Sequence, residues 1–226
     1  FFQNTASADL HLAGASVGDL NLAGIPIAGY PTDYDNEYRN NMFPYIGADE
    51  AIAFDLPVLN LNVNLEACSP NQDTVRVYLR NTTSPFTKID SAIGYLSPTG
   101  SVTLNFLNAL DGVSYYIVVK HRNSIETWSK AGGEVFSSGI LNYDFTTSAS
   151  QAYSSNMKLV GSKYSFYTGD VNNDGVVDGV DALLIDNDAS NFSTGYVITD
   201  LNCDSAVDAT DLLFADNNAS NFVGII

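Results

Sequence analysis

The chain has 226 residues, with 26 acidic and 9 basic side chains and a formal net charge of −17. This balance argues against binding to nucleic acid or to an anionic membrane, because both need clustered Lys and Arg. Hydrophobic residues make up 45% of the chain, which permits a buried core and argues against global disorder. No apolar run approaches the ~20 residues of a membrane span.

A short repeat opens the chain. Asp9-Leu-His-Leu-Ala-Gly14 recurs as Asp19-Leu-Asn-Leu-Ala-Gly24. Leucines alternate with polar residues in both copies, which predicts short strands with one buried face, and glycines between them predict turns. Short strands separated by Gly turns are typical of a solenoid, and the polar stretch that follows is typical of its cap.

Two motifs in this polar stretch resemble the end of a known kind of domain. They are Asp33-x-Asp-x-x-x-Arg39 and Ile46-Gly-Ala-Asp-Glu50. They resemble the C-terminal end of right-handed parallel β-helix domains in large secreted bacterial proteins. The resemblance implies that residues 1–50 are the end and cap of a β-helix whose earlier coils lie outside this sequence. Asp33, Asp35 and Glu37 could form a carboxylate pair or a cation site, but a solvated cap is the favoured interpretation.

Residues 51–168 are predicted to form an immunoglobulin-like β-sandwich. Apolar and polar residues alternate with a period of two through residues 59–65, 75–79 and 102–106. Residues 113–121 are rich in Val, Ile and Tyr, and residues 141–145 and 158–167 resemble further strands. Strands at this spacing are typical of immunoglobulin or fibronectin type III sandwiches, and Tyr115 or Tyr116 is placed to form a tyrosine corner.

The strongest pattern is a duplicated acidic loop near the C-terminus. Residues 170–193 and 200–223 are identical at 13 of 24 aligned positions. Each copy begins with a twelve-residue loop that has an oxygen-bearing side chain at positions 1, 3, 5, 9 and 12. This is the ligand spacing of an EF-hand calcium loop, in which position 7 adds a backbone carbonyl.

The spacing predicts two Ca²⁺ ions, one in each loop. Gly175 supplies the sharp turn at position 6 of the first loop, whereas Ser205 takes that position in the second and predicts a weaker site. Asp instead of Glu at position 12 favours a fixed structural site over a sensor that opens. The predicted ligands of the first loop are Asp170, Asn172, Asp174, Val176 (carbonyl), Asp178 and Asp181, and those of the second are Asp200, Asn202, Asp204, Ala206 (carbonyl), Asp208 and Asp211.

Each loop leads into a predicted amphipathic helix, and no amphipathic helix precedes either loop. Each unit is therefore half of a helix–loop–helix hand. Paired loop–helix units with this spacing resemble a type I dockerin domain, and the resemblance covers nearly all of residues 169–226. It implies calcium binding and docking to a cohesin domain on a partner protein.

Dockerins usually contact cohesins through loop positions 10 and 11, where a Ser-Thr pair is frequent, and along the helices. Here these positions hold Gly179-Val180 and Ala209-Thr210, and neither predicted helix carries Lys or Arg. A cohesin partner would therefore need a different complementary surface.

The cysteines and the ends of the chain bear on its location. Cys68 and Cys203 are too few for a disulfide framework; they either pair with each other or are both free. The N-terminus has neither the basic start nor the apolar core of a signal peptide and lacks an initiator Met, which is typical of a processed protein or a fragment. Calcium loops and few cysteines favour a secreted or surface-attached bacterial protein.

The whole sequence predicts a mainly β chain: a β-helix end (1–50), a sandwich (51–168) and a small α-helical calcium module (169–226). The predicted function is a non-catalytic, calcium-stabilised extracellular structural or adhesive module, which could belong to a filamentous assembly through its hydrophobic tail, 222–226. The alternatives are a docking module with a cohesin partner in a secreted polysaccharide-degrading system, and a carbohydrate-binding module. No catalytic residue is predicted; His121, at the end of an apolar strand, is interpreted as structural.

Overall fold

The computed structural model describes residues 2–4, 9–12, 19–33, 39, 44–46 and 56–225. These residues divide into two compact units, residues 1–56 and residues 57–226. The predicted three-domain boundaries remain a prediction, and each unit is described by itself. None of the helices in the described part of the chain has the length and hydrophobicity of a membrane span.

The first unit differs from the predicted solenoid. Its two described strands, β1 (Phe2–Asn4) and β2 (Asp9–Leu12), pair antiparallel, whereas coils of a β-helix pair parallel. The predicted strand in the second repeat is wrong, because Leu20–Leu22 forms a 3-10 helix. Arg39 donates hydrogen bonds to the carbonyls of Thr32 and Tyr45, which draws the polar segment together. The β-helix resemblance stays a prediction, and Asp35, Glu37 and residues 47–50 lie outside the described residues.

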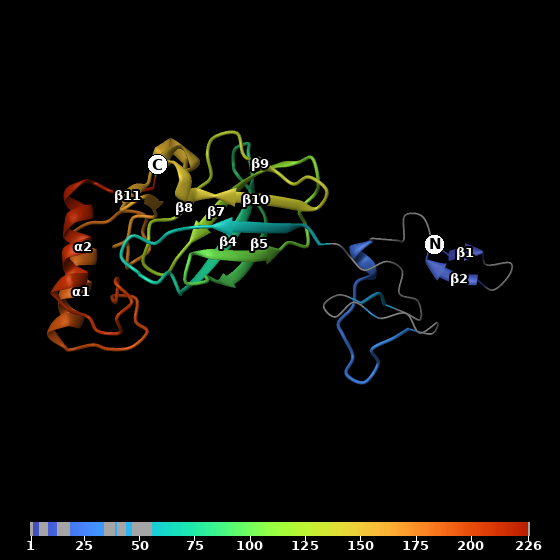
Figure 1. Cartoon of the computed structure of the whole chain (residues 1–226), viewed down its shortest axis with the longest axis horizontal. Helices are drawn as coiled ribbons and strands as arrows, with labels where there is room; N and C mark the ends of the chain where they lie inside the picture. Colours follow the sequence, from blue (N-terminus) through green and yellow to red (C-terminus); the bar gives the residue numbers. More distant parts are fainter. Residues whose placement is uncertain are drawn as a thin grey trace. The chain divides into compact units, whose positions relative to one another are not determined.

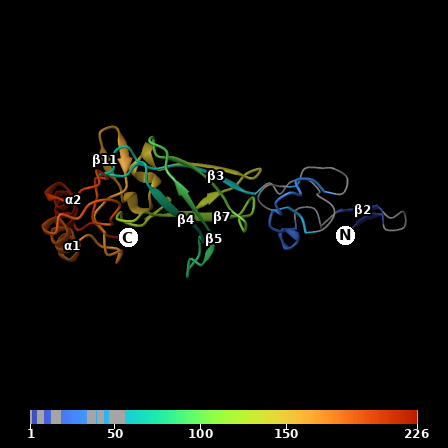
Figure 2. The ribbon, with the colours of Figure 1, turned by 90° about the horizontal axis from the view of Figure 1, so that it is seen from below.

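Two sheets form the first part of the second unit, and Figures 1 and 2 show them as two layers. The first has the strand order β10-β3-β6 and is built from β3 (Val58–Asn62), β6 (Ser101–Asn105) and β10 (Ile140–Asp144). The second has the order β5-β4-β7-β8, with β9 paired to β7, and is built from β4 (Thr74–Asn81), β5 (Lys88–Tyr95), β7 (Ser114–Lys120), β8 (Thr127–Trp128) and β9 (Glu134–Val135). Three 3-10 helices follow (Phe145–Thr147, Ala149–Gln151 and Tyr153–Ser155), and then the hairpin of β11 (Lys158–Val160) and β12 (Lys163–Ser165).

The core between the sheets follows from the period-two pattern. Alternate residues of a strand point to opposite faces, so the buried side chains of β3 and β4 meet between the layers. Pairing within the sheets is antiparallel except for β10 and β3, which run parallel. Tyr115 accepts a hydrogen bond from the Leu110 amide through its hydroxyl, 3.1 Å away, as a tyrosine corner would. The two-layer sandwich is therefore observed, and the immunoglobulin type stays a prediction.

The C-terminal module, residues 169–225, contains the two helices α1 (Gly179–Ser190) and α2 (Ala209–Ser220), which pack against each other. A small hydrophobic core holds them, and Val177, position 8 of the first loop, lies in it at 1% exposure. The same position of the second loop, Val207, is also buried there.

The two halves of the C-terminal module are interlocked. The segment after α1 pairs with the second loop, with the Val207 amide bonded to the Ser193 carbonyl at 3.0 Å. The segment after α2 pairs with the first loop, with the Val177 amide bonded to the Val223 carbonyl at 2.8 Å. Residues 223–225 are thus paired inside the chain, and assembly through the hydrophobic tail, 222–226, stays a prediction.

A disulfide joins the sandwich to the C-terminal module. Cys68 follows β3, and Cys203 is position 4 of the second acidic loop; their Cα atoms are 5.1 Å apart. The sequence left the pairing of these cysteines open. The bond spans 135 residues and ties the acidic loop covalently to the sandwich.

The guanidinium of Arg122 forms the polar centre of the same junction. It donates to Asp73 of the sandwich (2.8 Å) and to the Val197 carbonyl, and it lies over the Tyr196 ring at 4.5 Å. Burial alone would raise the pKa of Asp73, but hydrogen bonds from His121, Tyr196 and Arg122 outweigh it and hold this pKa well below its usual range.

Two further buried contacts cross the junction. Asn123 donates to the carbonyls of Ile198 and Asp200, both at 3.0 Å. Glu66 pairs with Lys158 and accepts hydrogen bonds from Asn218 of α2 (2.7 Å) and from the Thr168 amide (3.0 Å). These buried polar groups all have hydrogen-bond partners across the junction. The sandwich and the module accordingly belong to one compact unit.

Reduction of the disulfide should destabilise this unit. Loss of a cross-link that closes so long a loop restores chain entropy to the unfolded state, so we expect the melting temperature to fall by roughly 5–15 °C. Thermal unfolding with and without reductant measures the effect. The double variant Cys68→Ser/Cys203→Ser should melt at the reduced value and ignore reductant, and an identical melting temperature for the native chain in both conditions would contradict the account.

Candidate metal centre

The last four residues of each acidic loop also form the N-terminus of a helix. Asp178, loop position 9, is the N-cap of α1 and accepts a hydrogen bond from the Val180 amide at 2.7 Å. Asp181, position 12, accepts from the Asp178 amide at 2.9 Å and completes a capping box. Asp208 and Asp211 repeat both bonds at α2. The negative side chains also suit the positive ends of the helix dipoles.

The carboxylate at position 12 also closes its loop. Asp181 is fully buried and accepts hydrogen bonds from the amides of Val171 (2.9 Å) and Asn172 (3.1 Å). Asp211, likewise fully buried, does the same for Leu201 and Asn202. The last residue of each loop is therefore bonded to its second and third residues.

The side chains at loop positions 1, 3 and 5 accept hydrogen bonds from backbone amides of the same loop. Asp170 accepts from the amides of Asp174 (3.1 Å) and Gly175 (3.2 Å). Asn172 accepts from the Asp174 amide, and Asp174 accepts from the Val176 amide. The second loop repeats three of these hydrogen bonds. The amides of Asp204, Ser205 and Ala206 donate to the side chains at positions 3, 1 and 5, respectively.

The electrostatics of these loops fit a cation. Asp170 and Asp181 are 3% and 0% exposed, and no Lys or Arg of the described chain pairs with either. Buried carboxylates without a counter-charge are costly. Burial and, next, the charge of Asp181 raise the pKa of Asp170 to about 6. In the second loop, burial raises the pKa of Asp200, whose Oδ1 is buried without a hydrogen bond.

Oxygen is the only ligand atom that these positions offer, and Ca²⁺ prefers oxygen ligands. The residues present therefore fit Ca²⁺ in both loops. The loops differ at position 6, where Gly175 has φ +93° and Ser205 adopts φ +71°, a region that costs a non-glycine residue about 1 kcal/mol. Arg122 also lies 3.9 Å from Asp200, so the second loop has one protein cation that the first lacks.

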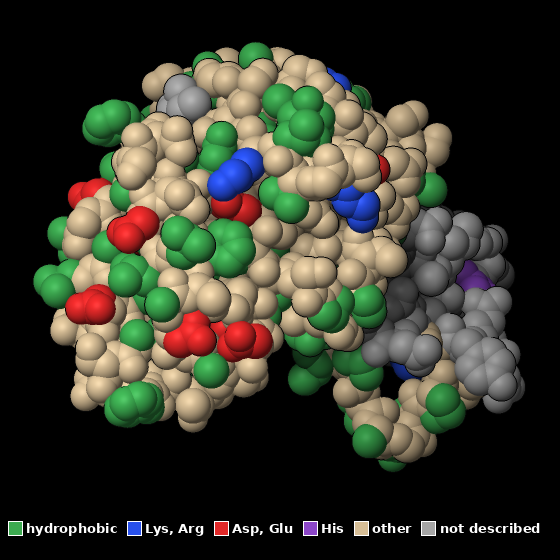
Figure 3. Space-filling view, turned by 60° about the vertical axis from the view of Figure 1, so that its left-hand side comes forward, with side chains coloured by type: hydrophobic (Ala, Val, Ile, Leu, Met, Phe, Trp, Pro, Cys, Tyr) green, Lys and Arg blue, Asp and Glu red, His purple; other side chains and the backbone are tan. Residues whose placement is uncertain are grey.

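The exposed faces of α1 and α2 carry matched apolar residues. Leu183 and Leu213 are 58% and 59% exposed, and Phe192 and Phe222 after the helices are 85% and 90% exposed. Val180, at position 11, is also exposed. On the face turned forward in Figure 3, acidic side chains are interspersed with hydrophobic ones. Large exposed apolar side chains at duplicated positions make this surface a candidate for contact with another macromolecule.

His121 lies in an arrangement that resembles a catalytic triad but is buried. Its Nε2 is 3.1 Å from Asp73, and its Nδ1 is 3.0 Å from the Ser124 hydroxyl. Ser124 and Asp73 are each 1% exposed, so a substrate could not reach the hydroxyl. The interpretation of His121 as structural stays a prediction, and its burial agrees with it.

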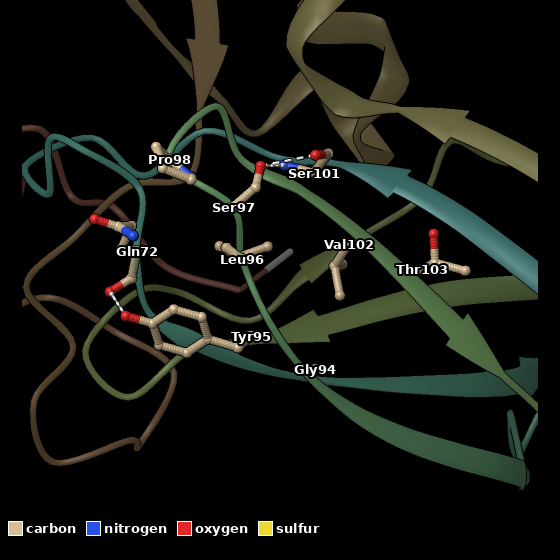
Figure 4. A pocket seen from close by; sticks show the side chains of 9 residues that line it. All are labelled: Gln72, Gly94, Tyr95, Leu96, Ser97, Pro98, Ser101, Val102 and Thr103. Carbon is tan, nitrogen blue, oxygen red and sulfur yellow. Dashed lines mark hydrogen bonds between the residues drawn. The ribbon is translucent and has the colours of Figure 1, made fainter.

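A groove of about 510 Å³ separates the edge strands β5 and β6. Figure 4 shows its lining, in which the Tyr95 hydroxyl donates to the Gln72 carbonyl and Ser97 contacts Ser101. Gly94 lets the two strands approach closely here, because a Cβ at this position would lie only 2.5 Å from the Val102 side chain. The lining contains no titratable acid, base or thiol that could act in catalysis at neutral pH.

A comparison with protein-family models matches residues 168–220 to the dockerin type I domain. The C-terminal module is a type I dockerin domain. Dockerins are non-catalytic docking modules that bind calcium and cohesin partners. The match favours the docking alternative of the sequence analysis over a purely structural or adhesive module.

Two solved structures are similar to the chain at low identity. One is a C-terminal interface mutant of a type II cohesin–X-dockerin complex from Acetivibrio cellulolyticus, at 14% identity, 73% of this chain, 99% of that chain and a TM-score of 0.46. The other is an N-terminal interface mutant of the same kind of complex, at 17% identity, the same coverages and a TM-score of 0.44. No curated protein matches the chain.

Sequence reasoning located the loops but missed what surrounds them. The structure places the twelve predicted ligand positions in two capped loops. Among the described residues, it does not bring three carboxylates of either loop within 4.8 Å of one another, and their binding of calcium stays a prediction. The junction residues Arg122, Asn123 and Glu66 were missed. One signal was present: Arg122 and Asn123 follow directly on an apolar strand, where a polar turn in contact with another element is common.

Acidity should stabilise the calcium-free dockerin. The pKa of Asp170 is raised in the folded chain to about 6 from 3.8, so between pH 7 and pH 5 the folded state takes up a proton that the unfolded state does not. In chelator the free energy of unfolding should therefore rise by about 1 kcal/mol over this range. In calcium it should fall, since protons compete with the ion.

Thermal unfolding at pH 7 and pH 5, with calcium and with chelator, measures this difference. The variant Asp170→Asn, which cannot take up the proton, should lose most of the rise in chelator. A calcium-free native chain that becomes less stable from pH 7 to pH 5 would contradict the assignment.

Proposed function

We propose that the dockerin domain attaches this chain to a cohesin domain of a partner protein outside the cell, as part of a secreted polysaccharide-degrading system. The observation that supports this most directly is the duplication of the exposed surface. Two capped loops present helices with leucines of nearly equal exposure, Leu183 and Leu213, at the same offset from each loop. A duplicated fold core alone would not need apolar side chains in solvent at both positions.

Calcium binding prepares this surface. Each loop binds one ion through the side chains at positions 1, 3, 5, 9 and 12 and the carbonyls of Val176 and Ala206. Two ions offset four of the eight carboxylates in the loops, and the capping boxes tie the ion sites to the first turns of α1 and α2. The helix faces are then fixed relative to each other before the partner arrives.

The chemistry of the surface defines the cohesin. Loop positions 10 and 11 hold Gly179-Val180 and Ala209-Thr210, so the hydroxyl pair that is frequent in dockerins is reduced to Thr210. Both helices lack Lys and Arg, and Asp186 and Asp216 are exposed at matched positions. A complementary cohesin presents an apolar surface for the leucines, with basic side chains at its rim.

Removal of a ligand from either loop should cost one ion. Asp174→Ala and Asp204→Ala change the same position of the two loops, and both side chains are exposed, so the loop core is kept. Calcium titration calorimetry should give two ions for the native chain and one for each variant. Asp186→Ala, on the exposed face of α1, serves as the matched control with two ions; two ions in both loop variants would contradict the ligand assignment.

An acidic residue at both leucine positions should weaken docking strongly. The variant Leu183→Asp/Leu213→Asp places charges at the centre of the proposed interface, and we expect at least tenfold weaker binding to a cohesin. Binding is measured by pull-down and calorimetry against a panel of cohesins in calcium. Leu159→Asp on β11 is the matched control, because Leu159 is 57% exposed. If no cohesin binds the native chain, or if the control weakens binding equally, the docking proposal fails.

A further inference from the structure

The outward face of the β5-β4-β7-β8 sheet is positively charged, although the chain is strongly acidic. The registers place Ile93, Arg76 and Lys120 side by side in one row across the strands. Four residues further along β4, Lys88, Arg80 and Tyr116 form another row. Between these rows lie Ser91, Tyr78, Val118 and Trp128. Val118 is fully buried and Tyr116 is 7% exposed, so the accessible part of this surface lies mainly on β4 and β5. This surface, which we call the basic face, holds four of the nine Lys and Arg residues of the chain and no Asp or Glu in its three rows.

Within the described part of the chain, these four cations lack an acidic partner. Among the described residues, every ion pair involves other basic groups, so Arg76, Arg80, Lys88 and Lys120 are not neutralised by a carboxylate. Arg76 and Lys88 are exposed. Unpaired cations on one sheet face give a local positive potential in a protein whose net charge is −17.

Aromatic rings hold part of this charge in place. The Arg80 guanidinium lies over the rings of Tyr78 (5.7 Å) and Trp128 (5.5 Å). Lys88, on the neighbouring strand β5, lies over the Tyr78 ring at 5.8 Å. Such cation–π contacts orient a cation without neutralising it. Phe86 and Tyr153, 37% and 38% exposed, pack around Tyr116 at the same end of the face.

The other end of the basic face opens into a groove of about 320 Å³. Arg76, Lys120 and Ile93 line it from the sandwich, and Tyr196 and Ile198 line it from the dockerin. The two cation rows are four residues apart on β4, which corresponds to about 13 Å along a strand. A ligand that meets both rows is therefore extended and carries several negative charges.

We infer that the basic face binds an acidic polysaccharide through its carboxylate or sulfate groups. Arg and Lys side chains meet these groups with charge-assisted hydrogen bonds. The exposed rings of Phe86 and Tyr153 offer apolar area to the C–H faces of sugar rings. The residues belong to the sandwich strands and not to α1 or α2, so the inference does not rest on the docking proposal.

Two other polyanions fit the face less well. Double-stranded DNA carries a charge about every 1.7 Å, and a protein with a large negative net charge repels so dense a polyanion strongly. A second copy of this chain offers few free carboxylates from its dockerin: eight of eleven acidic residues lie at ligand positions, and Asp188 is bonded to Thr199. Within the dockerin, this leaves Asp186 and Asp216 to meet four cations.

Affinity electrophoresis and calorimetry of the full chain test this inference. The probes are polyglucuronate, dextran as a neutral polysaccharide, polyglutamate as an acidic polypeptide and a single-stranded oligonucleotide, all with calcium in excess of the probe carboxylates. We expect binding to polyglucuronate, none to dextran, and a steep loss of affinity as salt rises. Preference for polyglutamate, preference for the oligonucleotide or absence of binding to polyglucuronate would each overturn the inference.

Variants locate the site. Arg76→Gln/Lys120→Gln and, at the other end, Lys88→Gln remove only side chains without hydrogen-bond partners, and we expect affinity to fall about tenfold and about threefold, respectively. Lys163→Gln, an exposed cation on β12, is the matched control and should bind as the native chain does. Cohesin binding should be unchanged in all of them. Equal affinity of the native chain and both basic-face variants would overturn the assignment, whatever the outcome of the cohesin assay.

Discussion

The guanidinium of Arg122 is the contact on which the arrangement of the sandwich and the dockerin domain depends. It is nearly buried, yet it meets Asp73 on one side, the Val197 carbonyl and Asp200 on the other, and the Tyr196 ring on its face. Removal of one partner of a buried pair costs about 3–5 kcal/mol, because the other charge is left unpaired. The neighbouring disulfide and the Asn123 hydrogen bonds fix the same short segment of the second loop. The sandwich thus holds the second loop most firmly, and it also contacts the first loop, where Asn173 donates to the Arg122 carbonyl at 3.1 Å.

This arrangement gives the calcium loops a second source of order. In an isolated loop, ligand carboxylates repel each other until an ion arrives. Here position 12 is held by backbone amides and position 9 caps a helix, and the first residue of the second loop is held through its carbonyl by Asn123. A calcium ion bound at the predicted ligands would then complete a nearly formed loop. Because each post-helix segment pairs with the opposite loop, order in one half is passed to the other.

The sequence predicted what local spacing determines. Ligand positions, helix starts and the buried side of each long strand follow from periods of twelve, 3.6 and two residues, and the structure bears out the helices and the strands. It does not reveal contacts between segments far apart in the chain. Glu66 and Asn218 are separated by 152 residues, and nothing near either predicts the other. The strand expected at residues 20–22 was wrong because two alternating leucines are too few to decide between a strand and a 3-10 helix.

Hydrogen exchange of the full chain, with calcium and with chelator, tests most directly whether the dockerin and the sandwich are one coupled unit. The structure predicts that chelation raises exchange in residues 170–211 and also at the sandwich side of the junction, residues 66–73 and 121–125, while β4 and β7 away from the junction stay protected. Faster exchange confined to residues 170–225, with the junction residues of the sandwich unchanged, would contradict the account.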